Sequence, residues 1–283
     1  MNALIGNVPL TQKEFLRLSS FIHTEFGIKM PPAKKILIES RLQKRLKRLG
    51  IGTFKEYCDY LFSSEGQRDE VPHFISQITT NKTDFFRESE HFNFLVTKAL
   101  PILLENGGSN RNLTAWSAGC STGEEPYTLA IVLNEFVQTK PDLGLKFSVL
   151  ATDVSPEVLQ VAKTAVYKEV STEPIPITLK QKYFLKNKDR NNPIVKVAPE
   201  LRRTVRFERL NFMDRDYGLK QSMDIIFFRN VLIYFDKPTQ EAILNKLCHC
   251  LKKGGYFFQG HSESTQGMNL PLKSVAPTIY QKI

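Results

Sequence analysis

Short apolar runs that alternate with amphipathic segments from about residue 113 onward constrain the fold most strongly. Strands buried on both faces are short and almost continuously apolar, and amphipathic segments between them are typical of helices that cover a parallel sheet. The sequence therefore predicts an α/β fold with helices that begin near residues 124, 156 and 238. The predicted strands are residues 113–118, 146–152, 205–211, 223–228, 256–260 and 278–282.

One segment, residues 167–204, does not fit this alternation. It is rich in proline and lysine, and it is longer than a single crossover requires. Two interpretations remain open, an inserted subdomain and a long loop.

The first ninety residues predict short helices instead of strands. Thr11 with Glu14, and Thr53 with Glu56, have the spacing of a capping box, which marks the start of a helix. The predicted helices cover residues 11–26, 33–49, 53–61 and 71–78. Because 283 residues can bury one sizeable core and a smaller second one, we predict a helical domain over residues 1–90 and an α/β domain over residues 91–283.

Charge and cysteine content limit the partners and the compartment. The formal charge of +10 favours an acidic partner, which nucleic acid, a lipid surface or an anionic protein could each provide. Cys58, Cys120, Cys248 and Cys250 are spaced neither as a disulfide framework nor as a zinc site, so we predict reduced thiols and no metal.

The apolar segments are too short or too interrupted for export or membrane insertion. Residues 1–10 lack the pattern of an export signal, and the most apolar run, residues 224–235, contains Arg229 and Asn230. We therefore expect a cytoplasmic protein.

The turn after the first predicted strand indicates a nucleotide site. Gly119 and Gly123 allow close approach of a ligand, although they also suit an ordinary tight turn. Asp153 ends the next strand, where a carboxylate can bind ribose hydroxyls or simply start a helix. The helix begins with Glu124 and Glu125, which would repel a pyrophosphate but suit a cationic amine and a sulfonium, so S-adenosylmethionine fits better than NAD.

Four motifs stand out along the chain: TTNKTDFFRE at residues 79–88, SAGCSTGEEPY at 117–127, ATD at 151–153 and RNVLIYFD at 229–236. In sequence and in order they resemble the motifs of one family, the chemotaxis-receptor glutamate methyltransferases, or CheR family. The resemblance covers nearly the whole chain, and it implies a Rossmann-like S-adenosylmethionine methyltransferase sheet with a small all-helical N-terminal domain. It also implies methylation of glutamates on the cytoplasmic signalling helices of chemoreceptors.

The resemblance also implies roles for individual residues. Glu124 would bind the amino group of the cofactor, Asp153 its ribose, and Arg87 its carboxylate end, which pairs opposite charges with a zwitterion. The other residues implied are Asn81 and Thr83 around the methionine end, and Asn211, Phe212, Arg229 and Asn230 around the adenosine and the methyl-transfer pocket.

Methyl transfer to a carboxylate needs no strong base, because a glutamate with a pKa near 4.3 is already ionised at neutral pH. Orientation and exclusion of water should provide the catalysis. We name Tyr234 and Arg87 as the catalytic candidates, although Tyr234 could equally be a packed ring. His261, a lone histidine, is more often structural.

The predicted helix at residues 33–49 carries a basic stripe. Lys34, Arg41, Arg45 and Arg48 fall within about 60° of one another on a helix, beside an apolar face. We expect these residues to bind an acidic receptor helix, although a charged stripe can be only a solvated face. By resemblance, residues 167–204 match the place where some relatives bind the C-terminal tail peptide of a receptor.

Two other functions remain as alternatives, a nucleic-acid methyltransferase and a binding-only scaffold. Base methylases place an Asp/Asn-Pro-Pro-aromatic motif where this chain has Arg229 and Asn230, which argues against nucleic acid. The presence of Asn81, Arg87, Glu124 and Asp153 argues against a scaffold that has lost its ligand.

Overall fold

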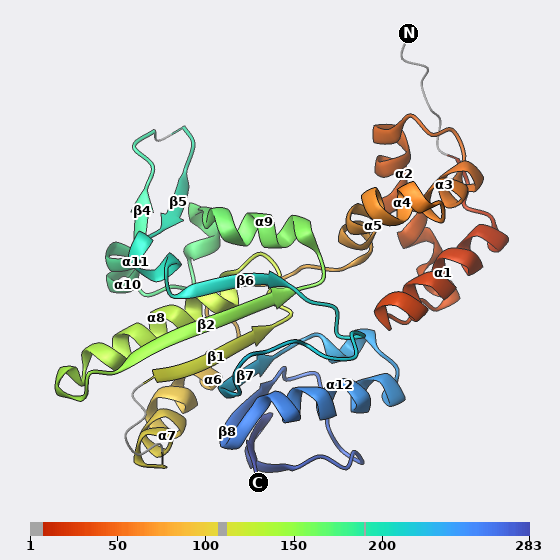
Figure 1. The fold of residues 1–283 in the computed structure, drawn as a ribbon. Helices are drawn as coiled ribbons and strands as arrows, with labels where there is room; N and C mark the ends of the chain where they lie inside the picture. The colour runs from red at the N-terminus through yellow and green to blue at the C-terminus, as the bar shows by residue number, and fades with distance from the viewer. Residues whose placement is uncertain (1–7, 107–111, 190) are drawn as a thin grey trace.

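The computed structural model describes residues 8–106, 112–189 and 191–283. The prediction made for residues 1–10 falls partly on residues 1–7, which lie outside the described residues. Figure 1 shows a helical unit at the N-terminus beside a sheet covered by helices. Within the described ranges, the structure has no helix of the length and apolarity that a membrane crossing requires.

The N-terminal unit consists of short capped helices, as the sequence predicts. The capping boxes at Thr11 and Thr53 are both formed, and the first helix ends at Gly27, whose φ of 68° is left-handed. A short 3-10 turn, Pro32–Lys34, precedes the second helix, and one helix, α4, was not predicted. The helices are α1 (Gln12–Phe26), α2 (Lys35–Leu49), α3 (Phe54–Leu61), α4 (Ser64–Asp69) and α5 (Val71–Ile78).

The second part is built on a seven-stranded sheet with the order β6-β2-β1-β7-β8-β10-β9. The first five strands in this order pair in parallel, and β10 and β9 pair antiparallel. All six predicted strands are confirmed, whereas β9 was missed. The strands are β1 (Asn112–Ala118), β2 (Lys146–Asp153), β6 (Val205–Arg209), β7 (Met223–Phe228), β8 (Leu251–Gln259), β9 (Leu272–Ala276) and β10 (Ile279–Lys282).

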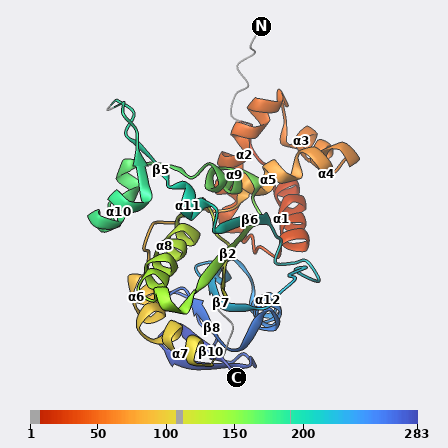
Figure 2. The same cartoon turned by 60° about the vertical axis from the view of Figure 1, so that its left-hand side comes forward.

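Helices cover both faces of this sheet, which explains why its central strands are apolar throughout. Phe227 packs in the core on one face and Phe228 in the core on the other, as alternation along a strand requires. Figure 2 shows α6, α7 and α8 on one side of the strands and α12 on the other. These helices are α6 (Ser89–Phe94), α7 (Leu100–Asn106), α8 (Glu124–Gln138), α9 (Pro156–Thr164), which contacts α5, and α12 (Lys237–Cys250).

The segment at residues 167–204 is a small subdomain and not a long loop. Its strands β3 (Val166–Lys168), β4 (Phe184–Lys186) and β5 (Ile194–Val197) form an antiparallel sheet with the order β3-β5-β4. It also contains α10 (Ile177–Tyr183) and α11 (Pro199–Arg202). Apolar side chains from these elements join the core beneath α8.

The cysteines are free thiols, as predicted. Cys58, Cys120 and Cys248 are buried, and Cys250 is half-buried. Burial raises the pKa of Cys58 and Cys248 to about 11, so both remain protonated at neutral pH.

Candidate active site

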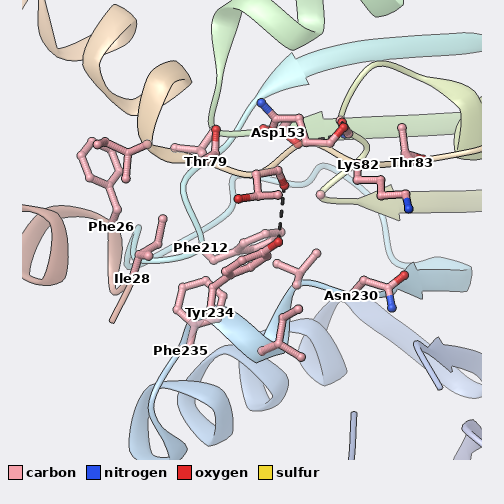
Figure 3. A pocket seen from close by; sticks show the side chains of 18 of the residues that line it. Phe26, Ile28, Thr79, Lys82, Thr83, Asp153, Phe212, Asn230, Tyr234 and Phe235 are labelled. Carbon is pink, nitrogen blue, oxygen red and sulfur yellow. Dashed lines mark hydrogen bonds between the residues drawn. The ribbon is translucent and has the colours of Figure 1, made fainter. Parts of the chain in front are cut away.

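A cavity of about 490 Å³ lies at the carboxyl ends of β1, β2 and β7, where the helical unit meets the sheet. Ligands bind at this edge in open parallel sheets. Figure 3 shows side chains from both parts of the chain, including Phe26 and Tyr234, around the cavity. The predicted site residues that line it are Lys34, Asn81, Thr83, Arg87, Asp153, Asn211, Phe212, Arg229, Asn230 and Tyr234.

Asp153 stands at the end of β2 with its carboxylate fixed by the backbone. One oxygen accepts the N–H of Ser121 at 2.9 Å, and the other accepts the N–H of Ser155 at 3.0 Å. Each oxygen retains acceptor capacity for a further donor. Burial raises the pKa of this carboxyl, and the backbone N–H groups oppose that shift. The geometry fits a group that accepts hydrogen bonds from two neighbouring hydroxyls.

The two glycines of the turn after β1 have different roles. Gly119 lines the cavity with a φ of 83°, and a Cβ there would lie 2.6 Å from Cγ2 of Val231. Gly123 packs elsewhere, because a Cβ there would meet Ala162 and Tyr167 at 2.8 Å. Only Gly119 provides the close approach to a ligand that the sequence suggested for both.

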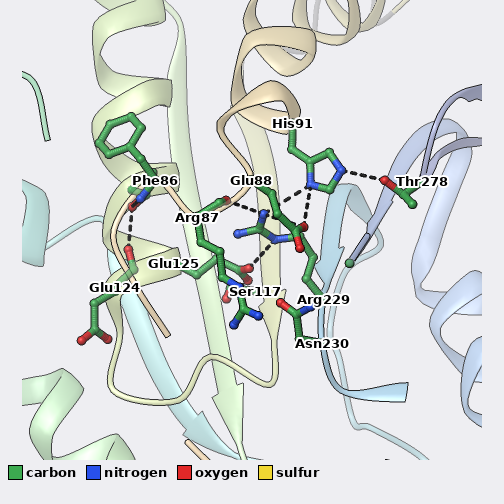
Figure 4. Close-up of polar contacts among 12 residues, drawn as sticks. Phe86, Arg87, Glu88, His91, Ser117, Glu124, Glu125, Arg229, Asn230 and Thr278 are labelled. Atoms are coloured by element: carbon green, nitrogen blue, oxygen red, sulfur yellow. Dashed lines mark hydrogen bonds and ion pairs between the residues drawn. The ribbon is translucent and has the colours of Figure 1, made fainter. Parts of the chain in front are cut away.

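Behind the cavity lies a buried polar cluster centred on Arg229 (Figure 4). Its Nε donates to Glu125 at 2.7 Å, and Nη1 donates to the carbonyl oxygen of Arg87 at 2.7 Å and to Glu88 at 3.3 Å. Ser117 donates to the other oxygen of Glu125 at 2.6 Å. Arg229 is only 6% exposed, and the carboxylates of Glu88 and Glu125 compensate its buried positive charge.

His91 belongs to the same cluster, and its own imidazole ring is neutral at pH 7. Burial, reinforced by the charge of Arg229, lowers the pKa of His91 to about 4. Its Nε2 lies 2.8 Å from Oγ1 of Thr278 and its Nδ1 lies 3.3 Å from Nη1 of Arg229. A neutral ring with one donor and one acceptor nitrogen satisfies both contacts.

His261 and the neighbouring residues do not call for a metal. Glu88, His91 and His261 offer ligand atoms within 4.8 Å of one another. However, Nη1 of Arg229 lies 3.3 Å from both Glu88 and His91, so a positive charge already occupies this position. We therefore propose no metal there.

Of the two acids that open α8, Glu125 reaches the cavity lining and Glu124 lies outside it. The Glu124 carboxylate accepts the hydroxyl of Thr122 at 2.6 Å. Figure 4 shows the Glu124 side chain directed away from the Arg229 cluster. The cavity therefore favours Glu125 over the implied Glu124 as the carboxylate nearest to a ligand.

The segment between the two parts of the chain forms one wall of the cavity. Thr79, Thr80, Asn81, Lys82 and Thr83 all line it. The carbonyl of Asn81 accepts the Ser121 hydroxyl at 2.9 Å, which ties this segment to the turn after β1. Arg87 lines the cavity and donates to the carbonyl of Lys82 at 3.1 Å.

Asn211, Phe212 and Asn230 form another part of the lining. Nδ2 of Asn211 donates to the carbonyl of Glu25 at 2.7 Å, so this amide also joins the sheet to α1. Phe212 is 7% exposed and packs edge-on against Phe228. Asn230 has a left-handed φ of 60°, which is unusual for a residue other than glycine.

Tyr234 lies at the meeting of the helical unit and the sheet. Its hydroxyl donates to the carbonyl of Thr80 at 3.4 Å, and Nζ of Lys34 lies 5.9 Å from the centre of its ring. Its backbone carbonyl accepts the N–H of Lys29 at 2.8 Å. Lys34 and Tyr234 thus face the same cavity from different parts of the chain.

The prediction of a basic stripe at the surface is wrong for Arg45. This residue is 8% exposed, and its guanidinium binds both oxygens of Glu70 at 2.6–2.9 Å. Arg41 is half-buried and donates to the carbonyls of Ile78 and Thr79. Helical spacing placed these side chains on one face, but partners at the two ends of α5, Glu70 before it and Ile78 and Thr79 at its end, decide their contacts. Arg48 alone among the three arginines is exposed.

Sequence reasoning missed several residues of the cavity. Ser121 was unremarkable in sequence, and its role follows from contacts with Asp153 and Asn81. Phe26, Ile28 and Met30 come from the helical unit, which sequence reasoning assigned only to the partner. Their apolar character signalled burial but not position at the cavity.

The comparisons with known proteins agree with the two-part fold. The CheR methyltransferase all-alpha domain matches residues 13–79, and the CheR methyltransferase SAM binding domain matches residues 81–280. The chain belongs to the CheR family. The family match makes this protein a methyltransferase that uses S-adenosylmethionine, so neither a nucleic-acid methyltransferase nor a binding-only scaffold is supported.

Individual relatives in the family match over nearly their full length. A chemotaxis protein methyltransferase of Borreliella burgdorferi is 40% identical over 98% of this chain and 96% of its own. Chemotaxis protein methyltransferase 2 of Pseudomonas aeruginosa is 36% identical over 95% and 93%, respectively. The corresponding Escherichia coli protein is 34% identical over 96% and 91%.

The cavity suits the S-adenosylmethionine of the family. Asp153 can accept the ribose hydroxyls, while Glu125 and Arg87 offer opposite charges for the amino-acid end. The ring of Phe212 lines the cavity with an apolar surface of the kind that an adenine ring can pack against. Bound there, S-adenosylmethionine supplies an electrophilic methyl group on a sulfonium.

Proposed function

We propose that this protein esterifies glutamate side chains on the cytoplasmic signalling helices of chemoreceptors. The observation that carries the proposal is one continuous cavity with cofactor-type residues at one end and a lysine and a tyrosine at the other. Asp153 and Glu125 lie on the sheet side, and Lys34 and Tyr234 lie where the helical unit closes over it. An acceptor side chain can enter at this junction.

The chain's own residues account for the steps that a carboxylate acceptor requires. Lys34 attracts the carboxylate, and the Tyr234 hydroxyl gives up its long 3.4 Å bond to the Thr80 carbonyl and donates to one carboxylate oxygen instead. The other carboxylate oxygen is left free to attack. The acceptor is ionised before it enters, so no residue has to remove a proton. Apolar residues from both parts, Phe26, Ile28 and Phe235 among them, exclude water that would compete with the carboxylate.

An alkali test distinguishes this chemistry from base methylation. The protein is incubated with methyl-labelled S-adenosylmethionine and either receptor signalling fragments or total RNA, and the products are then treated with mild alkali. We expect label on the receptor fragments that is released as volatile methanol, because esters hydrolyse under these conditions. Label on RNA that survives the alkali would contradict the proposal.

Replacing Lys34 or Tyr234, the two residues proposed to contact the acceptor carboxylate, should impair turnover without weakening cofactor binding. We expect Tyr234→Phe to lower kcat by about ten- to a hundredfold, the value of a hydrogen bond to a charged group. Lys34→Gln should raise the KM for the receptor fragment. Steady-state kinetics and calorimetry with S-adenosylhomocysteine measure the two effects separately.

Lys44→Gln is the matched control for Lys34→Gln, because Lys44 is an exposed lysine of α2 outside the cavity lining. It should alter the receptor KM much less. Wild-type kinetics in Tyr234→Phe would remove Tyr234 from the reaction and leave it as a packed ring.

We further propose how the receptor reaches this cavity. The helical unit, divided from the methyltransferase domain at about residue 90, presents the exposed Arg48 of α2 to an acidic receptor helix. The edges of the β3-β5-β4 sheet could accept a receptor tail peptide as an added strand. Because the signalling helices of receptors are cytoplasmic, the proposed activity belongs to the cytoplasm.

A further inference from the structure

Glu263 is a buried carboxylate that neither the sequence motifs nor the proposed reaction uses. It is 8% exposed and follows β8 in the turn of residues 260–263. One of its oxygens accepts the N–H groups of Asn230 at 2.9 Å and Gly260 at 2.8 Å. The other accepts the N–H of Leu232 at 2.7 Å.

The backbone that surrounds this carboxylate has the geometry of an anion-binding nest. Asn230 is left-handed with a φ of 60°, and Val231 is right-handed with φ −114° and ψ −38°. Successive residues of opposite hand turn their N–H groups toward one point, where an anion binds. Here Glu263 occupies that point, so the protein supplies its own anion.

Close packing shows that the nest and the turn are fitted to each other. A Cβ on Gly260 would lie 2.8 Å from the backbone nitrogen of Asn230 and 2.9 Å from Oε2 of Glu263. Any residue other than glycine would therefore push Glu263 away from the nest.

The nest forms a wall of the active-site cavity. Asn230 and Val231 line the cavity, and Val231 also fills the space above Gly119 in the turn after β1. The N–H of Leu232, held by Glu263, begins the short turn Leu232–Tyr234 that carries the proposed catalytic tyrosine. The left-handed Asn230 is a conformation that surroundings must enforce.

We propose that Glu263 is a positioning residue for methyl transfer: by filling the backbone nest at residues 230–232, it fixes both the cofactor wall and the direction of Tyr234. The part that concerns Tyr234 rests on the proposed function. The part that concerns the cofactor does not, because it can be measured without any acceptor.

The test compares Glu263→Gln with Asp224→Asn. Asp224 is also 8% exposed, belongs to β7 and accepts the backbone N–H of Thr114 at 2.8 Å, but it lies outside the cavity lining. Both changes should lower the melting temperature. In Glu263→Gln, the amide NH2 of glutamine would face a backbone N–H of the nest. Because two donors repel each other, residues 230–232, which form the cavity wall, should shift.

We expect Glu263→Gln to weaken S-adenosylhomocysteine binding in calorimetry by about tenfold, because a displaced wall would lose about one hydrogen bond to the cofactor. Asp224→Asn should bind it as the wild type does. If Glu263→Gln fails to fold, Glu263→Asp, which keeps the charge but shortens the side chain, should show the same loss to a smaller degree. A folded Glu263 variant with wild-type cofactor affinity and wild-type kcat would overturn the proposal.

Discussion

Replacing Arg45 with alanine is expected to lower the free energy of unfolding by about 3–5 kcal/mol, the cost of leaving a buried charge without its partner. The Arg45 guanidinium binds both oxygens of Glu70, and the Tyr57 hydroxyl donates to Glu70 at 2.8 Å. Glu70 is fully buried, so water cannot replace the lost arginine. Denaturant unfolding of the full chain measures the effect.

The control for this prediction lies on the same helix. Arg48 is exposed, and Arg48→Ala should change the free energy of unfolding by about 0.5 kcal/mol or less. If Arg45→Ala kept wild-type stability but lost receptor methylation, Arg45 would belong to the acceptor surface after all.

Replacing Asp153 with asparagine is expected to weaken S-adenosylhomocysteine binding by about a hundredfold, equivalent to about 3 kcal/mol. The amide keeps the size of the side chain but has one acceptor oxygen in place of two, whereas the ribose offers two donors. The Ser121 and Ser155 N–H groups already use part of the acceptor capacity at this position. Calorimetry on the folded variant checks the value.

Because the pKa of Asp153 is raised, we also expect cofactor binding to depend on pH. Burial raises the pKa of Asp153, and only its ionised form accepts both hydroxyls. Affinity should therefore fall on acidification, beginning at a higher pH than an exposed aspartate would give. Asp142→Asn, a change at an exposed residue of the short 3-10 turn Pro141–Leu143 before β2, should leave affinity unaltered. Full affinity in Asp153→Asn would remove Asp153 from the ribose site.

Much of the fold could be predicted because its signals are local. The capping boxes at Thr11 and Thr53 depend on a residue and its neighbour three positions later, and both form as predicted. The central strands β1 and β7 are short and apolar, and helices follow β1, β2 and β7 along the chain. Strand β9 was missed because its exposed lysine and serine, Lys273 and Ser274, give no apolar run.

The candidate site was predicted in outline and corrected in detail. Asp153 and Gly119 were found because strand ends and glycine turns mark the ligand edge of such a sheet. Glu124 and Glu125 are adjacent in sequence, and only packing against Ser117 and Arg229 decides which one reaches the cavity.

The sequence by itself determined the family, the cofactor and the order of the six predicted strands of the main sheet, because motifs and periodicity are properties of neighbouring residues. Only the tertiary structure decided which charged side chains stay exposed and which find a buried partner. Arg45 meets Glu70, and Asn230 meets Glu263, across separations of 25 and 33 residues. Such pairs form where packing removes water and each buried charge must find a partner, a condition that helical spacing cannot express.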